Sequence, residues 1–158
     1  MKEICLNNVV MDQERINKER MVLAYYLSGG NLFEFVGLNT STPYLRIVAQ
    51  TNNNHIFVLR MYLNNYPYEK PSVYVEMMLK DCHGRDMNSA SSTNHTLSPH
   101  SNGWTQICHY HPEAWRPDLS LWLVYLKCLL WLNIYEETLR TGEDMEYYLK
   151  HQKASDVY

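Results

Sequence analysis

The stretch 98–130 constrains the fold more than any other part of the chain, because a polar loop there runs directly into a strongly apolar segment. The loop carries Cys108. Three histidines lie near this thiol in the sequence: His100, His109 and His111. The apolar residues that follow recur at helical spacing, which predicts a helix whose N-cap is Asp118 or Ser120. A helix that is apolar nearly all round is typically buried, so we expect it to brace the loop that carries the thiol.

The predicted buried face of this helix consists of residues spaced three and four apart. Its members are Leu119, Trp122, Leu123, Leu126, Leu129 and Leu130. Four further residues would widen the face: Val124, Tyr125, Cys128 and Trp131. The pattern ends at Thr141-Gly142, and a last short helix is predicted over 143–150.

The first half of the chain predicts one helix and four strands. The helix covers 10–28, has its charged residues on a face that we interpret as solvent-exposed, and ends at Gly29-Gly30. The strands cover 32–38, 44–50, 55–63 and 72–79, separated by turn-forming residues, which indicates an antiparallel meander. A polar segment, 81–97, is predicted to be a mobile loop. Strands grouped together, with helices at both ends, predict an α+β fold.

Composition narrows the functional class. With 158 residues the chain is long enough for one domain and short for two. A net charge of −3 argues against a nucleic-acid footprint. The four cysteines show no regular spacing, which favours a reducing compartment: Cys5, Cys82, Cys108 and Cys128. No secretory signal and no run long enough to span a bilayer is evident, so we expect a cytoplasmic protein that does not bind membranes.

The order of these elements and three local motifs resemble the ubiquitin-conjugating enzyme fold. The first motif is YPYEKP (66–71), similar to the family's YPxxPP segment with Lys70 in place of a proline. The second is GWTQIC (103–108), similar to the family's G-x-I-C with a longer spacing between the glycine and the isoleucine. The third is WRP (115–117), similar to the family's W-[ST]-P and followed by the apolar helix. The resemblance implies a single domain over 1–158 with an N-terminal helix, a four-stranded meander, a long active-site loop and C-terminal helices.

The resemblance also implies that Cys108 accepts the C-terminus of a ubiquitin-like or target protein as a thioester and transfers it to an amine. The chain departs from the family at its HPN tripeptide, where SPH (98–100) places His100 at the asparagine position. A histidine there is expected to stabilise the oxyanion or to act as a base. Such drift resembles bacterial ubiquitin-conjugating-like proteins of antiphage defence operons, notably CBASS, which modify a cGAS-like nucleotidyltransferase.

Cys108 is therefore the predicted nucleophile, with His100, His109 and His111 as the predicted catalytic histidines. The chain has no glycine-rich nucleotide loop, so we expect no cofactor. Its predicted partners are a ubiquitin-like modifier or protein target and a separate activating enzyme that would supply the thioester. The charged face of the first helix is then a candidate docking surface for that enzyme. Alternatively, Cys108 would attack a peptide or ester bond directly, with a histidine as base.

Two other readings remain open from the sequence. One is a ubiquitin-conjugating-like binding platform that has lost catalysis, which the replaced asparagine favours. The other is a small zinc-stabilised regulatory domain, with five candidate ligands: His95, His100, Cys108, His109 and His111. The only closely spaced set among them is Cys-His-Tyr-His, and adjacent residues rarely share one tetrahedral ion. We therefore predict no metal ligand in this loop.

Overall fold

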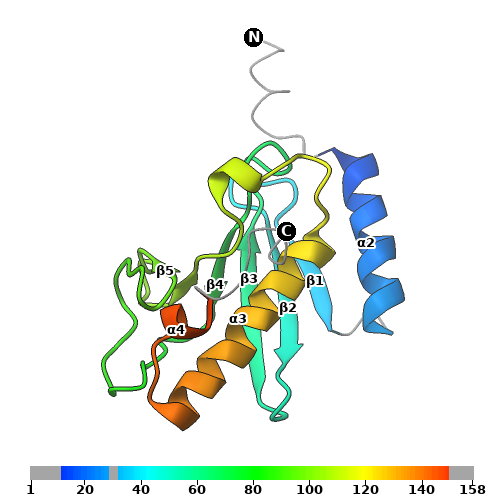
Figure 1. Cartoon of the computed structure of the whole chain (residues 1–158). Helices are drawn as coiled ribbons and strands as arrows, with labels where there is room; N and C mark the ends of the chain where they lie inside the picture. The colour runs from blue at the N-terminus through cyan, green and yellow to red at the C-terminus, as the bar shows by residue number, and fades with distance from the viewer. Residues whose placement is uncertain (1–11, 29–31, 150–158) are drawn as a thin grey trace.

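A computed structural model describes residues 12–28 and 32–149. These residues form an α+β fold with an N-terminal helix, an antiparallel sheet and C-terminal helices (Figure 1). The helices are α2 (Gln13–Leu27), the 3-10 turn η1 (Pro112–Ala114), α3 (Leu121–Thr141) and α4 (Met145–Leu149). The strands are β1 (Phe33–Val36), β2 (Tyr44–Gln50), β3 (Ile56–Tyr62), β4 (Ser72–Val75), β5 (Thr96–Leu97) and β6 (Gln106–Ile107).

The sheet extends the predicted meander by two short strands. Within the described residues it has six strands in the order β1-β2-β3-β4-β6-β5, and every neighbouring pair is antiparallel. The expected four-stranded sheet is thus corrected, since the hairpin of β5 and β6 adds to the edge of β4. Two-residue strands leave no periodic pattern in a sequence. The fourth strand is also shorter than predicted and ends at Val75, because the backbone then turns to bond Met77 to Val75 and Thr105.

One face of the sheet is buried against α3, which crosses it diagonally (Figure 1). In β2 the side chains of Leu45, Ile47 and Ala49 point into the core, and their neighbours are only partly buried. The register places Leu45 beside Met61 and Ile47 beside Leu59, so the buried rows continue across the sheet. The strand thus buries every second residue, because successive side chains point to opposite faces of a sheet.

The buried face of α3 matches the predicted one only in part: Leu119 is buried, and so are the four residues predicted to widen the face. Its side of the core is formed by Leu121, Val124, Tyr125, Cys128, Trp131, Leu132 and Tyr135. Three of the leucines predicted to be buried are exposed instead: Leu123, Leu126 and Leu130. The helix begins after the N-cap Ser120, whose hydroxyl accepts from Leu123 N at 3.2 Å, and not after Asp118. Because the helix is apolar on several sides, spacing alone could not determine which side meets the sheet.

The N-terminal helix begins and ends close to its predicted bounds. Asp12 caps α2 by accepting from the backbone of Glu14 and Arg15, and Ser28 ends it in the left-handed conformation. The predicted start at Val10 and the stop at Gly29-Gly30 lie outside the described residues. The charged face is only partly solvent-exposed, because Glu19 is buried to 3% exposure.

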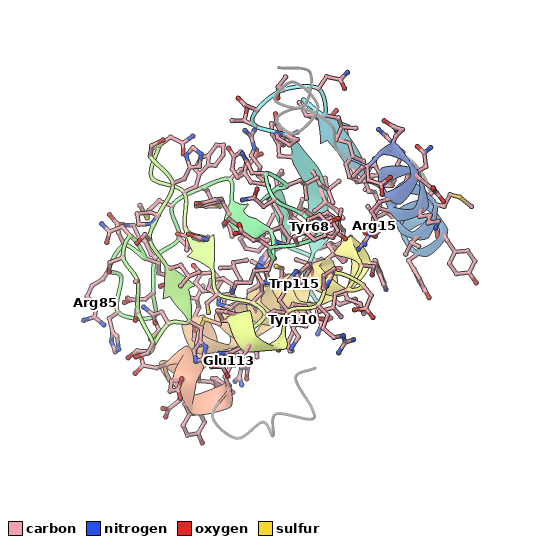
Figure 2. All side chains as sticks on the ribbon, turned by 90° about the horizontal axis from the view of Figure 1, so that it is seen from above. Arg15, Tyr68, Arg85, Tyr110, Glu113 and Trp115 are labelled. Atoms are coloured by element: carbon pink, nitrogen blue, oxygen red, sulfur yellow. The ribbon has the colours of Figure 1, made fainter. Side chains whose placement is uncertain are left out.

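The segment 81–97, predicted as a mobile loop, contains hydrogen-bonded turns and the strand β5. Bridges join Lys80 to Asp86 and Ser91 to Thr96. Viewed from above, Arg85 of this segment lies at the rim of the molecule, far from Arg15 of α2 (Figure 2). Within the described ranges, no helix combines the length and apolar character that a membrane crossing requires.

Candidate functional site

Cys108 directly follows β6, a strand that lies inside the sheet between β4 and β5. Its backbone N–H donates to the carbonyl of His95 at 3.0 Å. Side-chain hydrogen bonds fix the residues before it: the hydroxyl of Thr105 donates to Met87 O at 3.1 Å and accepts from Leu79 N at 3.0 Å. The thiol is partly exposed, and no disulfide joins the cysteines of the described ranges, which are Cys82, Cys108 and Cys128. Cys108 is thus a thiol on a rigid support, reachable from solvent.

Lys70 lies within electrostatic range of this thiol although it is far from it in sequence. Its ammonium donates to the carbonyl of Tyr110 at 2.5 Å. Burial lowers the pKa of the Lys70 ammonium, and the charge of a Cys108 thiolate opposes that shift. A half-buried cation within electrostatic range of a thiol favours the thiolate form.

We expect Lys70→Met to slow the alkylation of Cys108. Removing a partly buried positive charge is worth about 0.5–1.5 kcal/mol, which corresponds to a rate reduction of roughly 2–10-fold at pH 7. The measurement is the rate of iodoacetamide labelling at Cys108, resolved by peptide mass. Lys70→Arg should keep most of the rate, and Lys80→Met, which removes a lysine paired with Asp86, should leave it unchanged. Equal rates for Lys70→Met and Lys80→Met would contradict the assignment.

His109 is tied to the backbone under the site. Its Nε2 donates to the carbonyl of Pro71 at 2.6 Å, which leaves Nδ1 unprotonated. This Nδ1 atom is buried and has no hydrogen-bond partner among the described residues. Burial lowers the pKa of His109 to about 4, and Lys70 and Lys127 shift it in the same direction while the Pro71 carbonyl opposes them. His109 is therefore a neutral side chain at pH 7 and a weak base.

The lowered pKa of His109 predicts acid lability. The folded protein holds fewer protons at this site than the unfolded chain between pH 6.5 and about 4. The His109 contribution to stability is therefore complete above pH 6.5 and is lost as the pH falls to about 4, by up to about 3 kcal/mol.

Urea unfolding of the wild type and of His109→Gln at a series of pH values measures this contribution. The variant's stability should depend less on pH in that window. Groups that titrate elsewhere are present in both proteins, so the difference isolates His109. If the free energies of unfolding of the two proteins changed in parallel with pH, protonation of His109 would not destabilise the fold.

His100 lies on the face of the sheet that α3 does not cover, where it stabilises the turn before β6. Its Nδ1 accepts from Asn102 N at 3.2 Å, so Nε2 carries the proton and donates to the hydroxyl of Tyr62 at 3.1 Å. The ring stacks on Tyr62 and contacts the rings of Tyr74 and Trp104. Both nitrogens are therefore engaged in holding the loop, and no hydrogen bond joins this ring to Cys108 in the described part of the chain.

His111 precedes η1, with its side chain exposed. It makes no side-chain capping bond. Of the three histidines predicted near the thiol, only His109 packs into the interior beside the Cys108 segment. The catalytic role of each histidine stays a prediction.

The segments 66–71 and 115–117, singled out in the sequence, contact one another next to the Cys108 loop. The Tyr66–Pro67 peptide is cis. Trp115 Nε1 donates to the Pro67 carbonyl at 2.8 Å, and its ring packs against those of Tyr66 and Tyr110. Figure 2 shows Trp115 and Tyr110 together in the loop that leads to α3. These contacts fix the direction in which the chain leaves Cys108.

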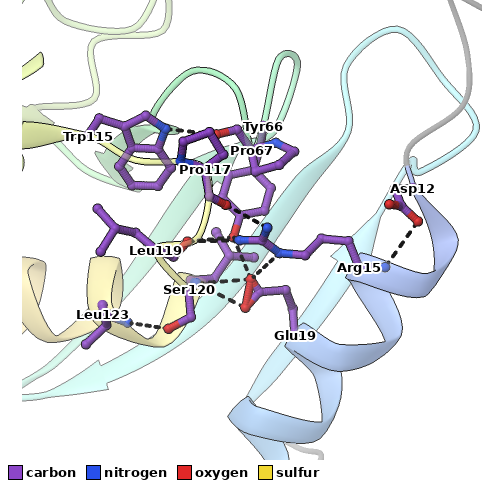
Figure 3. Close-up of polar contacts among 11 residues, drawn as sticks. Asp12, Arg15, Glu19, Tyr66, Pro67, Trp115, Pro117, Leu119, Ser120 and Leu123 are labelled. Carbon is purple, nitrogen blue, oxygen red and sulfur yellow. Dashed lines mark hydrogen bonds and ion pairs between the residues drawn. The ribbon is translucent and has the colours of Figure 1, made fainter.

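A buried polar cluster connects this crossing to α2 (Figure 3). Glu19 accepts from the Tyr66 hydroxyl at 2.5 Å and from Leu121 N at 3.2 Å. Arg15 donates to Tyr66 and to the carbonyls of Pro117 and Leu119. Burial, followed by the charge of Glu19, raises the pKa of Tyr66 far above its usual range. The cluster anchors α2 to the start of α3.

Sequence reasoning missed the partners of the site. Lys70 had a visible signal, since it replaces a proline in an otherwise recognisable motif. Arg15 and Glu19 had none beyond their spacing of four, which is common on solvent-exposed helices. The five zinc candidates are not brought together, because His95 pairs with Glu146 and His100 lies on the outer face.

Comparison with known proteins adds no assignment: no family model, no curated protein and no solved structure matches the chain.

Proposed function

We propose that the chain is a ubiquitin-conjugating-like acyl carrier that holds a protein C-terminus as a thioester on Cys108. The observation that carries the proposal is a partly exposed thiol at the end of an internal strand, within electrostatic range of the Lys70 ammonium. Cys128 offers a contrast within the same chain. It is fully buried on α3, and burial raises the pKa of its thiol strongly. A thiolate is the reactive form of cysteine, so Cys128 is unsuited to the proposed chemistry.

The proposed reaction is two successive acyl transfers. The Cys108 thiolate attacks the thioester carbonyl presented by an activating enzyme, and that enzyme's thiolate leaves. An amine then attacks the Cys108 thioester, forming an amide and expelling the Cys108 thiolate, while the proton of the amine passes to solvent or a nearby base. The Cys108 N–H is already bonded to His95 O, so it is a poor donor to the developing oxyanion. The Lys70 ammonium, which interacts electrostatically with Cys108, would take that role.

The element order supports the same proposal. A helix, a meander, a cysteine-bearing segment and an apolar helix follow one another as the resemblance to ubiquitin-conjugating enzymes requires. His100 stabilises the turn before the cysteine, which is one of the roles ascribed to the asparagine of that family. The cargo and target we propose are a protein C-terminus and a cGAS-like nucleotidyltransferase of an antiphage system.

The test is intact mass of the chain co-expressed with the neighbours of its gene. We expect an adduct on the wild type that thiol reagents remove, and none on Cys108→Ala. Cys108→Ser is a more discriminating variant, because an ester on serine survives thiol reagents while adding the same mass as the thioester. No adduct on the wild type, with full cellular activity of Cys108→Ala, would refute the carrier and leave the binding platform.

A further inference from the structure

A second group of chemically active side chains lies beside the C-terminal end of α3. It consists of Cys82 and His83 from the 81–97 segment and Asp144 from the turn between α3 and α4. Their ligand atoms all lie within 4.8 Å of one another. His83 Nε2 and Asp144 Oδ1 are 3.9 Å apart, and the Cys82 thiol lies 3.6 Å from the Gly142 carbonyl. Figure 1 shows α4 next to the segment that carries the two neighbouring ligands.

We propose that Cys82, His83 and Asp144 bind a divalent transition metal ion of the zinc class. Zinc is held by thiolate, imidazole and carboxylate at about 2.0–2.3 Å, which places tetrahedral ligands roughly 3.3–3.8 Å apart. The distances between these ligand atoms are within a few tenths of an ångström to about one ångström of that value. Side-chain rotation is sufficient to close such a gap. The fourth position is open to water, since the side chains of His83 and Asp144 are 54% and 43% exposed.

Adjacent residues rarely bind one ion, but the backbone here removes that objection. Asp81 is buried, and its Oδ1 accepts from His83 N at 2.8 Å and Arg85 N at 3.0 Å. Its carbonyl accepts from Gly84 N at 3.0 Å, with Gly84 at a φ of +80° that favours glycine. This tight turn brings the side chains of Cys82 and His83 to the same side. In an extended strand they would point to opposite faces.

The third ligand is held by independent contacts. Gly142 ends α3 in the left-handed conformation, and Met145 is buried at 1% exposure just beyond it. Asp144 lies between these two anchors, and its carbonyl accepts from Tyr147 N at 3.1 Å. Both halves of the site are therefore fixed by the fold before any ion arrives, which reduces the ordering cost of binding.

The local charges favour a cation. Asp144 belongs to the cluster itself, and the buried carboxylate of Asp81 directly precedes Cys82 in the chain, so two carboxylates lie at or next to the site. A divalent ion would be attracted by these carboxylates, and the thiol would release its proton to solvent on binding it. The donor set of one sulfur, one nitrogen and one oxygen selects zinc over calcium and magnesium, which prefer oxygen ligands alone.

A metal at this site would join the 81–97 segment to the α3–α4 turn. Those two segments already meet through the bond from Glu146 N to Thr93 O at 3.0 Å and through the His95–Glu146 pair. The carbonyl of His95 in turn accepts from Cys108 N. The ion would therefore stabilise the support of Cys108 without touching it, and the site does not depend on the chemistry of Cys108.

The test is a cobalt(II) titration of the untagged full-length chain in metal-free, reducing buffer. We expect one equivalent to produce the thiolate-to-cobalt charge-transfer absorption, and one equivalent of zinc to abolish it, while millimolar magnesium or calcium does not. Cys108→Ser should keep the absorption and Cys82→Ser should lose it. His83→Asn and Asp144→Asn should each weaken cobalt binding by more than about 10-fold.

Thermal unfolding separates a binding defect from a folding defect. Zinc should raise the Tm of the wild type and of Cys108→Ser, and should leave the Tm of Cys82→Ser unchanged. Without metal, Cys82→Ser should unfold at the temperature of the wild type, because it exchanges one small polar group for another. Absence of charge transfer in the wild type, or its persistence in Cys82→Ser, would overturn the proposal.

Discussion

Replacing Glu19 by alanine is expected to destabilise the folded chain by about 3 kcal/mol, although the residue lies on a helix face rich in charged side chains. Its carboxylate is 3% exposed and accepts from Tyr66, from Leu121 N and from Arg15. Removal would leave the Leu121 N–H buried without its acceptor and would deprive Arg15 of its charge partner. The free energy of unfolding from urea titration measures the effect.

Glu14→Ala is the matched control on the same helix. Glu14 is exposed and, among the residues that the structure describes, its carboxylate pairs only with the exposed Lys18 at 3.5 Å, so its loss should cost less than about 1 kcal/mol. Glu19→Gln should fall between the two, because the amide keeps one acceptor oxygen but loses the charge. Equal effects of Glu14→Ala and Glu19→Ala would show that the cluster in Figure 3 contributes no stability.

The second large effect is expected at Leu132, where truncation to alanine should cost about 2–5 kcal/mol. Leu132 is fully buried in the face of α3 that packs on the sheet. Deletion of a buried leucine side chain forfeits its transfer free energy and leaves a cavity in a close-packed region.

Leu130→Ala tests the orientation of α3 directly, because it makes the same change two residues away. Leu130 is 40% exposed, and its truncation should cost less than about 1 kcal/mol. Unfolding in urea should show similar m-values for both variants, so that the midpoints report stability alone. A larger loss of stability for Leu130→Ala than for Leu132→Ala would show that α3 packs on the face predicted from the sequence.

The sequence pattern was sufficient to predict some element bounds but not the orientation of α3. The strand Tyr44–Gln50 has its predicted bounds, because turn-forming residues on both sides mark where it begins and ends. The orientation of α3 was missed because Leu, Trp and Tyr occur on every side of it, and the sheet decides among them. Glycine correctly marked the end of that helix at Gly142.

The candidate site was predictable only in part. The sequence identifies the cysteine and the turn before it, because both belong to one continuous segment. It does not identify Lys70, or the acceptors of His100 and His109, because these contacts join residues that are 38 positions apart. Nor does it predict that Cys82 and His83 meet Asp144, which requires the closed turn at 81–85 and the end of α3 to be placed side by side.

The strand order also bears on self-association. The longest strands, β2 and β3 with seven residues each, lie inside the sheet, and its two outer positions in the described structure are held by β1 with four residues and β5 with two. Unpaired backbone at a sheet edge is a template for pairing with another chain, and short edges offer little of it. A chain with so many tyrosines and apolar residues can therefore reach high concentrations in its folded form without stacking sheet edge to sheet edge.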